Sequence, residues 1–259
     1  MTSQQTWPHP DIQDDLKTLR QHVPLVHCLT NVVVSGFTAN VLLAIGASPA
    51  MVIAEEEAAE FAAIASALLI NVGTITSDQS RSIAKAVIAA NGAGKPWVLD
   101  PVAVGFLSLR TQVATELLEH HPTIIRGNAS EIIALAGGEA GGRGVDSTAS
   151  SNSAVDAAKA LAKKVGTVVA VSGEIDYITD GNEVVEVPGG HVIMTRVTGT
   201  GCSLGAVMAA FLGAGIPALR AATAASAIFA RAGEQAFAQS RGPGSFAVAL
   251  IDELALIGT

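Results

Sequence analysis

Short apolar segments of strand length alternate with longer segments of helical period along most of the chain. This alternation predicts an α/β fold in which helices pack on both faces of a mostly parallel central sheet. The predicted strands span residues 25–29, 50–53, 68–72, 97–99, 123–125 and 168–171. Because the alternation continues along the chain, it predicts one domain over residues 1–259.

Apolar periodicity and capping signals locate two of the helices more precisely. In the segment 109–121, apolar residues recur every four positions from Leu109, which predicts one buried helical face. Ser153 and Asp156 have the spacing of a capping box, so a second helix is predicted to start there and to end at Gly166.

The remaining segments deviate from the alternation. Two antiparallel edge strands are predicted at 177–179 and 184–187, and three alanine-rich helices are predicted at 200–212, 217–238 and 244–257. Residues 137–150 are rich in glycine and hydroxyl side chains, which indicates a surface loop inside the same domain. We expect residues 1–10 to be flexible.

Composition narrows the class of protein. Only 15% of the 259 residues are charged, against about 25% in typical soluble domains, which indicates that part of the surface lies in subunit interfaces. The net charge is −8 and the 15 basic residues are scattered, which opposes binding to nucleic acid. The longest apolar stretch, 206–219, is shorter than the ~18 residues of a membrane span.

The same features suggest where the protein works. The first residues have neither the basic nor the apolar region of a secretory signal. The two cysteines, Cys28 and Cys202, are far apart and match no metal-binding spacing, which fits a reducing, cytoplasmic setting. We therefore expect a cytoplasmic protein that binds neither a membrane nor nucleic acid.

A glycine-rich turn, VTGTGCSLGA at 197–206, leads directly into an apolar helix. Such a turn can direct backbone N–H groups and the positive end of the helix dipole at an anion. An ordinary glycine-rich helix start is an equally good interpretation. No acidic residue follows at the distance of a dinucleotide fold, and the Gly-Lys pair at 94–95 lacks the rest of a Walker A loop.

Carboxylates and a base follow neighbouring predicted strands. Asp100 comes directly after residues 97–99, and Glu131 follows the next strand. Two carboxylates at neighbouring strand ends can hold a hydrated Mg²⁺, although a capping box of Asn128 with Glu131 is the stronger interpretation of that residue alone. Arg126 at the same edge can clamp a phosphate or can be an ordinary surface base.

Three other positions have ambiguous roles by themselves. Ser172 ends a predicted strand, where its hydroxyl can meet a nucleotide or form a plain turn. Asn31 follows the first predicted strand and is most simply an N-cap for the next helix. Met51 is more often a core residue than a ligand contact.

Taken together, these segments resemble the hydroxyethylthiazole kinase family, whose fold is ribokinase-like. The ordered motifs span Pro24 to about Leu256 and are TN at 30–31, GASPAM at 46–51, INVGT at 70–74, LDPV at 99–102, RGNASE at 126–131 and VTGTGC at 197–202. The resemblance implies ATP-dependent phosphorylation of the primary hydroxyl of 4-methyl-5-(2-hydroxyethyl)thiazole in thiamine biosynthesis and salvage. It also implies Mg²⁺ and a homotrimer whose substrate pockets lie between subunits.

The resemblance also assigns roles to individual positions. The implied thiazole contacts are Asn31, Met51 and Gly199, the implied ATP contacts are Arg126 and Ser172, the implied metal ligands are Asp100 and Glu131, and the implied anion hole is Gly199, Thr200, Gly201 and Cys202. Cys202 takes the place of the aspartate base of sugar kinases of this fold. Because a helix N-terminus lowers a thiol pKa, we expect Cys202 to be a catalytic residue with a modest contribution.

Some positions depart from the family pattern. Where the family usually has DPVGVG, Ala103 replaces the first glycine and Phe106 follows Gly105, so the fit of the nucleotide is expected to change. Ser172 stands at a position that is often threonine and keeps the hydroxyl.

Three other functions are compatible with parts of this pattern. They are a related kinase for a pyrimidine or pyridoxal-type alcohol, a non-catalytic nucleotide-binding trimer, and a hydrolase that pairs Cys202 with His27 or His191. The first would usually carry aspartate at position 202, and no sequence feature connects either histidine to the cysteine.

Overall fold

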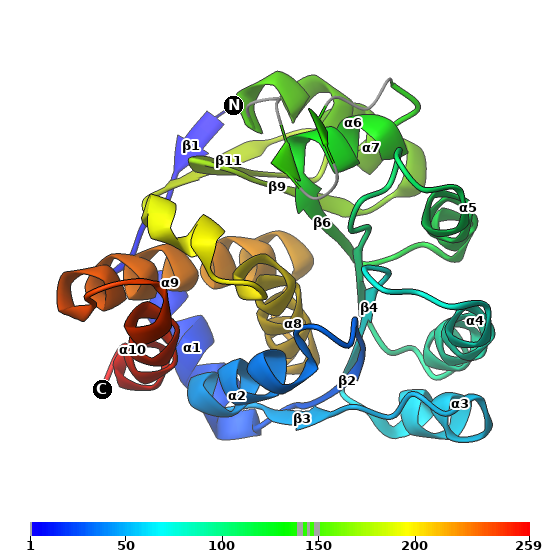
Figure 1. Ribbon diagram of the computed structural model, residues 1–259, viewed down its shortest axis with the longest axis horizontal. Coiled ribbons are helices and arrows are strands. Elements are labelled where there is room, and N and C mark those ends of the chain that lie inside the picture. Colours follow the sequence, from blue (N-terminus) through cyan, green and yellow to red (C-terminus); the bar gives the residue numbers. More distant parts are fainter. Residues whose placement is uncertain (1, 139–141, 144–145, 148–150) are drawn as a thin grey trace.

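A computed structural model describes residues 2–138, 142–143, 146–147 and 151–259. One nine-stranded sheet forms its centre (Figure 1), in the order β1 (Thr2–Gln4), β11 (Val184–Pro188), β10 (Ile175–Thr179), β9 (Val168–Ser172), β6 (Ile124–Asn128), β5 (Trp97–Asp100), β4 (Ala67–Asn71), β2 (Leu25–Leu29) and β3 (Ser48–Ala50). Only β10 runs antiparallel to its neighbours. The predicted α/β class and the mostly parallel sheet are confirmed.

Helices cover both faces of the curved sheet. On the inner side in Figure 1 lie α1 (Pro10–His22), α2 (Ser35–Ile45), α8 (Thr200–Gly213), α9 (Ala218–Gln239) and α10 (Pro243–Leu256). On the outer side lie α3 (Glu55–Ile64), α4 (Ser77–Gly92), α5 (Ser108–Leu117), α6 (Ala129–Leu135) and α7 (Val155–Val165). Each face has its own cluster of buried apolar side chains, so the sheet separates two hydrophobic cores.

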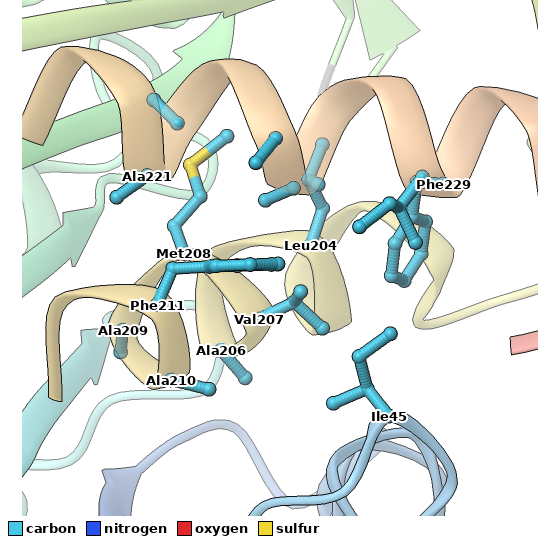
Figure 2. Packing of buried hydrophobic residues seen from close by; sticks show 14 of the residues in the cluster. Ile45, Leu204, Ala206, Val207, Met208, Ala209, Ala210, Phe211, Ala221 and Phe229 are labelled. Carbon is cyan, nitrogen blue, oxygen red and sulfur yellow. The ribbon is translucent and has the colours of Figure 1, made fainter. Parts of the chain in front are cut away.

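Helix α8 lies at the centre of the inner core and is buried almost all round. It packs between strands β4 and β5 on one side and helices α2 and α9 on the other. Figure 2 shows Phe211 and Met208 of α8 near Ala221 of α9, with Ile45 of α2 on the opposite side. The buried alanines of α9 let the two helices approach closely.

The N-terminal segment differs from the expected flexibility. Strand β1 pairs in parallel with β11, and the backbone N–H of Gln5 donates to the carbonyl of Glu186 at 3.0 Å. This pairing satisfies backbone groups that an edge strand would leave open. The predicted antiparallel pairing of 177–179 with 184–187 is confirmed, but neither strand lies at an edge, because β10 pairs with β9 as well as with β11, and β11 pairs with β1.

Some element boundaries shift because pairing and burial override the local pattern; β6, for example, ends at Asn128 and not at residue 125. The strand predicted at 50–53 is Ser48–Ala50, because its register pairs Ser48 with Leu25 of β2. The helix predicted over 109–121 is α-helical only to Leu117 and continues as a 3-10 turn, and Leu109 is 39% exposed.

The capping box predicted at Ser153 and Asp156 is wrong. A 3-10 turn occupies Ser151–Ala154, and α7 begins after Ala154 as its N-cap. The Ser151 hydroxyl donates to the carbonyl of Ile175 at 2.7 Å, which ties this turn to β10.

Part of the predicted loop at 137–150 lies outside the described residues, namely 139–141, 144–145 and 148–150. Within it, β7 (Gly142–Arg143) pairs antiparallel with β8 (Asp146–Ser147). Across the described ranges, none of the helices combines the length and the apolar character that crossing a membrane requires.

Candidate active site

The predicted site residues meet where the parallel strands end. Asp100 ends β5, Ser172 ends β9, and Arg126 is the third residue of β6. In open α/β sheets, ligands bind in the crevice beyond the carboxyl ends of the strands. The first turn of α8 lies at the same edge, because Gly201 packs against Arg126 and Cys202 contacts Asn31.

Asp100 is fully buried at this edge. Its Oδ2 accepts a hydrogen bond of 2.6 Å from Asn71 Nδ2. Its Oδ1 has no hydrogen-bond donor, and Arg126 Nη1 lies 3.7 Å away. Burial raises the pKa of Asp100 to about 7; the Arg126 charge opposes this rise and the Glu131 charge adds to it.

Arg126 links two strands to the start of α8. Its Nε donates to Ser172 Oγ at 3.0 Å. A Cβ placed on Gly201 would lie 2.9 Å from Arg126 Nη2, so the guanidinium packs directly against the first turn of α8. Burial opposes the charge, but Asp100 and Glu131 raise the Arg126 pKa overall and keep the side chain cationic.

Glu131 forms the capping box that the sequence predicts with Asn128. Its Oε2 accepts from the Asn128 N–H at 2.8 Å, and its Oε1 accepts from the Ala103 N–H at 2.8 Å. Burial raises its pKa, and these two backbone donors oppose the rise. Glu131 therefore holds the loop after β5 as well as the start of α6.

The glycine-rich turn begins α8 as predicted. Gly199 is the N-cap with φ of 95°, a conformation that L residues with side chains rarely adopt. The Thr200 hydroxyl donates to the carbonyls of Met194 and Val197, which holds the preceding segment against the helix. The first N–H groups of an α-helix have no acceptor within the helix, so those of the first turn are available to an anion.

The expected lowering of the Cys202 pKa is wrong. Burial raises the pKa of the thiol to about 11, and the nearby Asp100 carboxylate adds to the rise. The Arg126 charge opposes this rise without cancelling it. The thiol is therefore protonated at neutral pH, and a thiolate base is not available in this state.

Asn31 is not the N-cap of the next helix. Helix α2 starts at Ser35 with Val34 as N-cap. Asn31 is instead buried, and its Nδ2 donates to Asn71 Oδ1 at 2.9 Å and to Cys202 Sγ at 3.5 Å. The structure thus joins Asn31 to the start of α8.

Met51 and Gly199, the other two residues implied to contact the alcohol, lie near Asn31. Met51 is partly buried and packs against the inner core, so its packing role is confirmed. A Cβ on Gly199 would lie 3.1 Å from side-chain atoms of Val34 and Phe37, so a larger residue would crowd the start of α2.

Asn71 is a residue of this site to which no role is assigned from the sequence. It ends β4, is buried, and bonds both Asp100 and Asn31. The signal was a polar residue at the end of an apolar strand, as at Asp100, but an asparagine there is also common in plain turns.

Neither histidine of the hydrolase alternative pairs with Cys202 in the described part of the chain. His27 Nε2 lies 2.7 Å from the carbonyl oxygen of Val52. His191 accepts from the Ile193 N–H and stacks on Phe237 with ring centroids 3.4 Å apart. The geometry gives Cys202 no base for nucleophilic catalysis.

The donor set at this edge fits Mg²⁺ that arrives with phosphates. Asp100 Oδ1 is a buried carboxylate oxygen without a hydrogen-bond donor. Within the described ranges, no three histidine, cysteine or acidic side chains cluster as a metal site. Mg²⁺ usually keeps several waters and binds through one or two carboxylates and substrate phosphates, so Asp100 with Glu131 nearby suffices.

The fold and this edge together define a class of protein, a small-molecule kinase with a ribokinase-like fold. A ribokinase-like superfamily protein from Enterococcus faecalis V583 superposes with a TM-score of 0.66 at 13% identity, covering 98% of this chain and 95% of that one, which shows the fold. Closer relatives define the family.

The sequence model of the hydroxyethylthiazole kinase family matches residues 16–259. Hydroxyethylthiazole kinase from Leptospira interrogans serogroup Icterohaemorrhagiae serovar Lai is 58% identical over 253 residues, 98% of this chain and 96% of the relative. The structure of a hydroxyethylthiazole kinase protein from Pyrococcus horikoshii OT3 has a TM-score of 0.86 at 41% identity, covering 95% and 93% of the two chains. The chain belongs to the hydroxyethylthiazole kinase family and is a kinase.

Proposed function

We propose that this kinase transfers the terminal phosphoryl group of ATP to the primary hydroxyl of 4-methyl-5-(2-hydroxyethyl)thiazole, a step in thiamine biosynthesis and salvage. Family membership supports the alcohol, and one structural observation supports the reaction. Cys202, bonded to Asn31 on one side, lies beside the Asp100 carboxylate, which has Arg126 on its other side. An alcohol and a phosphate bound at these groups meet at the start of α8.

The nucleotide side consists of cationic and N–H groups. Arg126 and Ser172 contact the phosphates of ATP in this proposal, and the N–H groups of Gly199, Thr200, Gly201 and Cys202 form the anion hole. The packing of Arg126 on Gly201 supports it, because it brings the guanidinium and the helix N-terminus to one place. Ala103 and Phe106 then lie in the loop that the nucleotide approaches.

Asp100 and Glu131 hold the Mg²⁺ ion in this proposal. The ion neutralises phosphate charge when it is bound. Asp100 offers the open carboxylate oxygen, whereas both oxygens of Glu131 already accept backbone N–H groups. We therefore assign direct coordination to Asp100 and a role through charge or bound water to Glu131.

The alcohol side consists of Asn31, Met51 and Gly199. Phosphoryl transfer requires an oxygen in line with the leaving group and positive charge around the equatorial oxygens, and the protein contributes mainly by positioning and electrostatics. Asn31 and Cys202 orient the hydroxyl, while Arg126 and the helix N-terminus stabilise the charge of the transferring group.

We further propose a homotrimer in the cytoplasm. Val32, Val33 and Ile53 are 68%, 62% and 49% exposed and adjoin Asn31 and Met51 in the sequence. Burial of these side chains by a second subunit would place the alcohol pocket at a subunit interface. Both cysteines are free thiols, which supports a reducing compartment.

The test is phosphorylation by the purified protein with ATP and Mg²⁺. The thiazole alcohol, pyridoxal and hydroxymethylpyrimidine are compared in parallel by detection of each phosphate ester. We expect selective formation of the thiazole phosphate. Preferential phosphorylation of pyridoxal or the pyrimidine would replace the proposed substrate with the alternative.

A matched pair of arginine variants tests the nucleotide side. Arg126→Gln removes the buried cation, whereas Arg81→Gln removes an exposed arginine that pairs with Glu55 and Asp78 on the outer helices. We expect loss of turnover in the first and unchanged turnover in the second.

A further inference from the structure

Asn71 occupies a position between the two substrate sides of the site. It is the last residue of β4 and lies opposite Asp100 in the parallel register of β4 and β5. Its side chain is buried, with 3% exposed. Its amide contacts Asp100 on β5 and Asn31 beyond β2, so it spans the strand ends on both sides of β4.

The chemistry of its partners fixes the orientation of the Asn71 amide. A backbone N–H can only donate, so the amide atom that faces the Gly73 N–H must be the acceptor Oδ1, and the atom 2.6 Å from Asp100 Oδ2 is the donor Nδ2. Asn71 Oδ1 then accepts from the Gly73 N–H at 2.9 Å. A flipped amide would place an oxygen against the carboxylate and an NH₂ group against a backbone donor.

This orientation determines that of Asn31. Asn71 Oδ1 is an acceptor, so Asn31 must direct its Nδ2 at it, at 2.9 Å. The second Asn31 N–H donates to Cys202 Sγ at 3.5 Å, which uses both donors of the amide. Among the residues that the structure describes, none donates to Asn31 Oδ1, so that carbonyl oxygen is left for a ligand.

Gly73 keeps the two amides in contact. A Cβ at this position would lie 3.0 Å from Asn31 Nδ2, 3.0 Å from Asn71 Oδ1 and 3.1 Å from Asn31 Cβ. These distances are shorter than ordinary van der Waals contacts. The pair therefore depends on a glycine as well as on the amides.

We propose that Asn71 is a positioning residue that makes Asn31 present its carbonyl oxygen, and not its NH₂ group, to the alcohol. The inference rests on the proposed binding of the alcohol at Asn31. A hydroxyl that donates its proton to Asn31 Oδ1 keeps an oxygen lone pair free for phosphorus. An NH₂ group in its place would donate to that lone pair and compete with the attack.

A double-mutant cycle tests this relation. We expect Asn71→Ala to lower kcat for the alcohol by about 100-fold, the size of effect that misplacing a reacting group produces. The KM for ATP should stay within about two-fold, because Arg126 and Ser172, the residues proposed to contact ATP, keep their mutual hydrogen bond. In an Asn31→Ala background, Asn71→Ala should lower kcat by less than about three-fold, because Asn31 is no longer there to position.

Two additional variants separate positioning from stability. Gly73→Ala disturbs the pair without removing any hydrogen-bonding group, and it should reproduce the loss of kcat with an unchanged KM for ATP. Asn91→Ala removes an amide that bonds Trp97 and the His120 carbonyl at the far end of α4. It should lower the melting temperature and leave both kinetic constants unchanged. If Asn71→Ala does not fold, Asn71→Ser takes its place, since its hydroxyl cannot reach both partners.

The outcomes are distinguishable. Equal losses of kcat in the presence and absence of Asn31, or an unchanged kcat in Asn71→Ala, would overturn the proposal. The wild-type enzyme tests the substrate separately: if it phosphorylates pyridoxal instead of the thiazole, the substrate assignment is wrong. The cycle is then measured with that alcohol, because the argument concerns a hydroxyl and not the thiazole ring.

Discussion

At the scale of single residues, Ala103 has the left-handed backbone that glycine favours, with φ of 58°. Its N–H donates to Glu131, so the loop cannot relax without losing that bond. An L residue is strained in this conformation, and the strain exceeds the entropy that glycine loses on folding. Ala103→Gly should raise the free energy of unfolding by about 0.5–1 kcal/mol, measured by urea denaturation.

Ala84→Gly is the matched control for this substitution. Ala84 is exposed within α4, where glycine is a poor helix former, so the same change should cost about 1 kcal/mol. A destabilised Ala103→Gly variant would show that backbone strain at Ala103 is not the controlling factor.

A second residue-scale prediction concerns the role of the Cys202 thiol in turnover. Its pKa of about 11 leaves a protonated thiol that contacts Asn31. A serine hydroxyl is too short to keep that contact, so Cys202→Ser should slow turnover by about 3–10-fold and leave alcohol binding largely intact. General-base catalysis contributes about 10²–10⁴-fold to the rate, so a loss of turnover in that range would show that Cys202 acts as a general base. Unchanged turnover would remove Cys202 from the mechanism.

His27 is expected to make stability depend on pH. It is fully buried, its Nε2 donates to Val52, and Nδ1 has no partner. Burial lowers its pKa below the ordinary value of 6.5, although the Val52 carbonyl opposes the shift. The unfolded chain therefore binds the proton first, and stability is lost as the pH falls through about 6.5.

The measurement is urea unfolding between pH 8 and pH 5 for the wild type and His27→Gln, which keeps a donor for Val52. The difference between their stabilities should change by at most about 1.4 kcal/mol per pH unit. Parallel pH dependences in the two proteins would contradict the assignment.

At the scale of elements, the start of α8 is matched to the guanidinium carried by β6. A Cβ on Gly201 would lie 2.9 Å and 3.0 Å from the two terminal nitrogens of Arg126. Gly201→Ala should displace Arg126 and reduce kcat/KM for ATP by at least about 10-fold. Thermal unfolding should change little, because the displaced group is the end of a side chain.

Gly244→Ala supplies the control, since a Cβ there meets nothing within 4 Å at the start of α10. It should leave kinetics unchanged and stabilise the helix slightly. Equal activity in Gly201→Ala and the wild type would show that Arg126 does not act at the helix N-terminus.

At the scale of the whole molecule, the proposed trimer makes a joint prediction for mass and activity. Val33→Asp places a charge on the exposed apolar segment beside Asn31, so it should reduce both the light-scattering mass and turnover. Ile88→Asp, equally exposed on α4 on the outer side of the sheet, should change neither. A wild-type protein that is monomeric and active would contradict the proposed trimer.

The sequence by itself determined the architecture. Strand β2 matches its prediction, and the starts and ends of α8, α9 and α10 agree to within one residue, because apolar periodicity is a local property of the chain. It also placed Asp100, Arg126 and Ser172 at one edge, since parallel strands end together. The capping role of Glu131 followed from its spacing to Asn128.

Only the tertiary structure decided which atoms meet. The pairing of β1 with β11 joins residues about 180 positions apart, and no local pattern encodes that contact. The same holds for Asn31 and Cys202, which meet through the packing of α8 on the sheet and thereby turn an expected N-cap into part of the site. The Cys202 pKa rises for the same reason, because burial and the Asp100 charge depend on the assembled fold and not on the helix end alone.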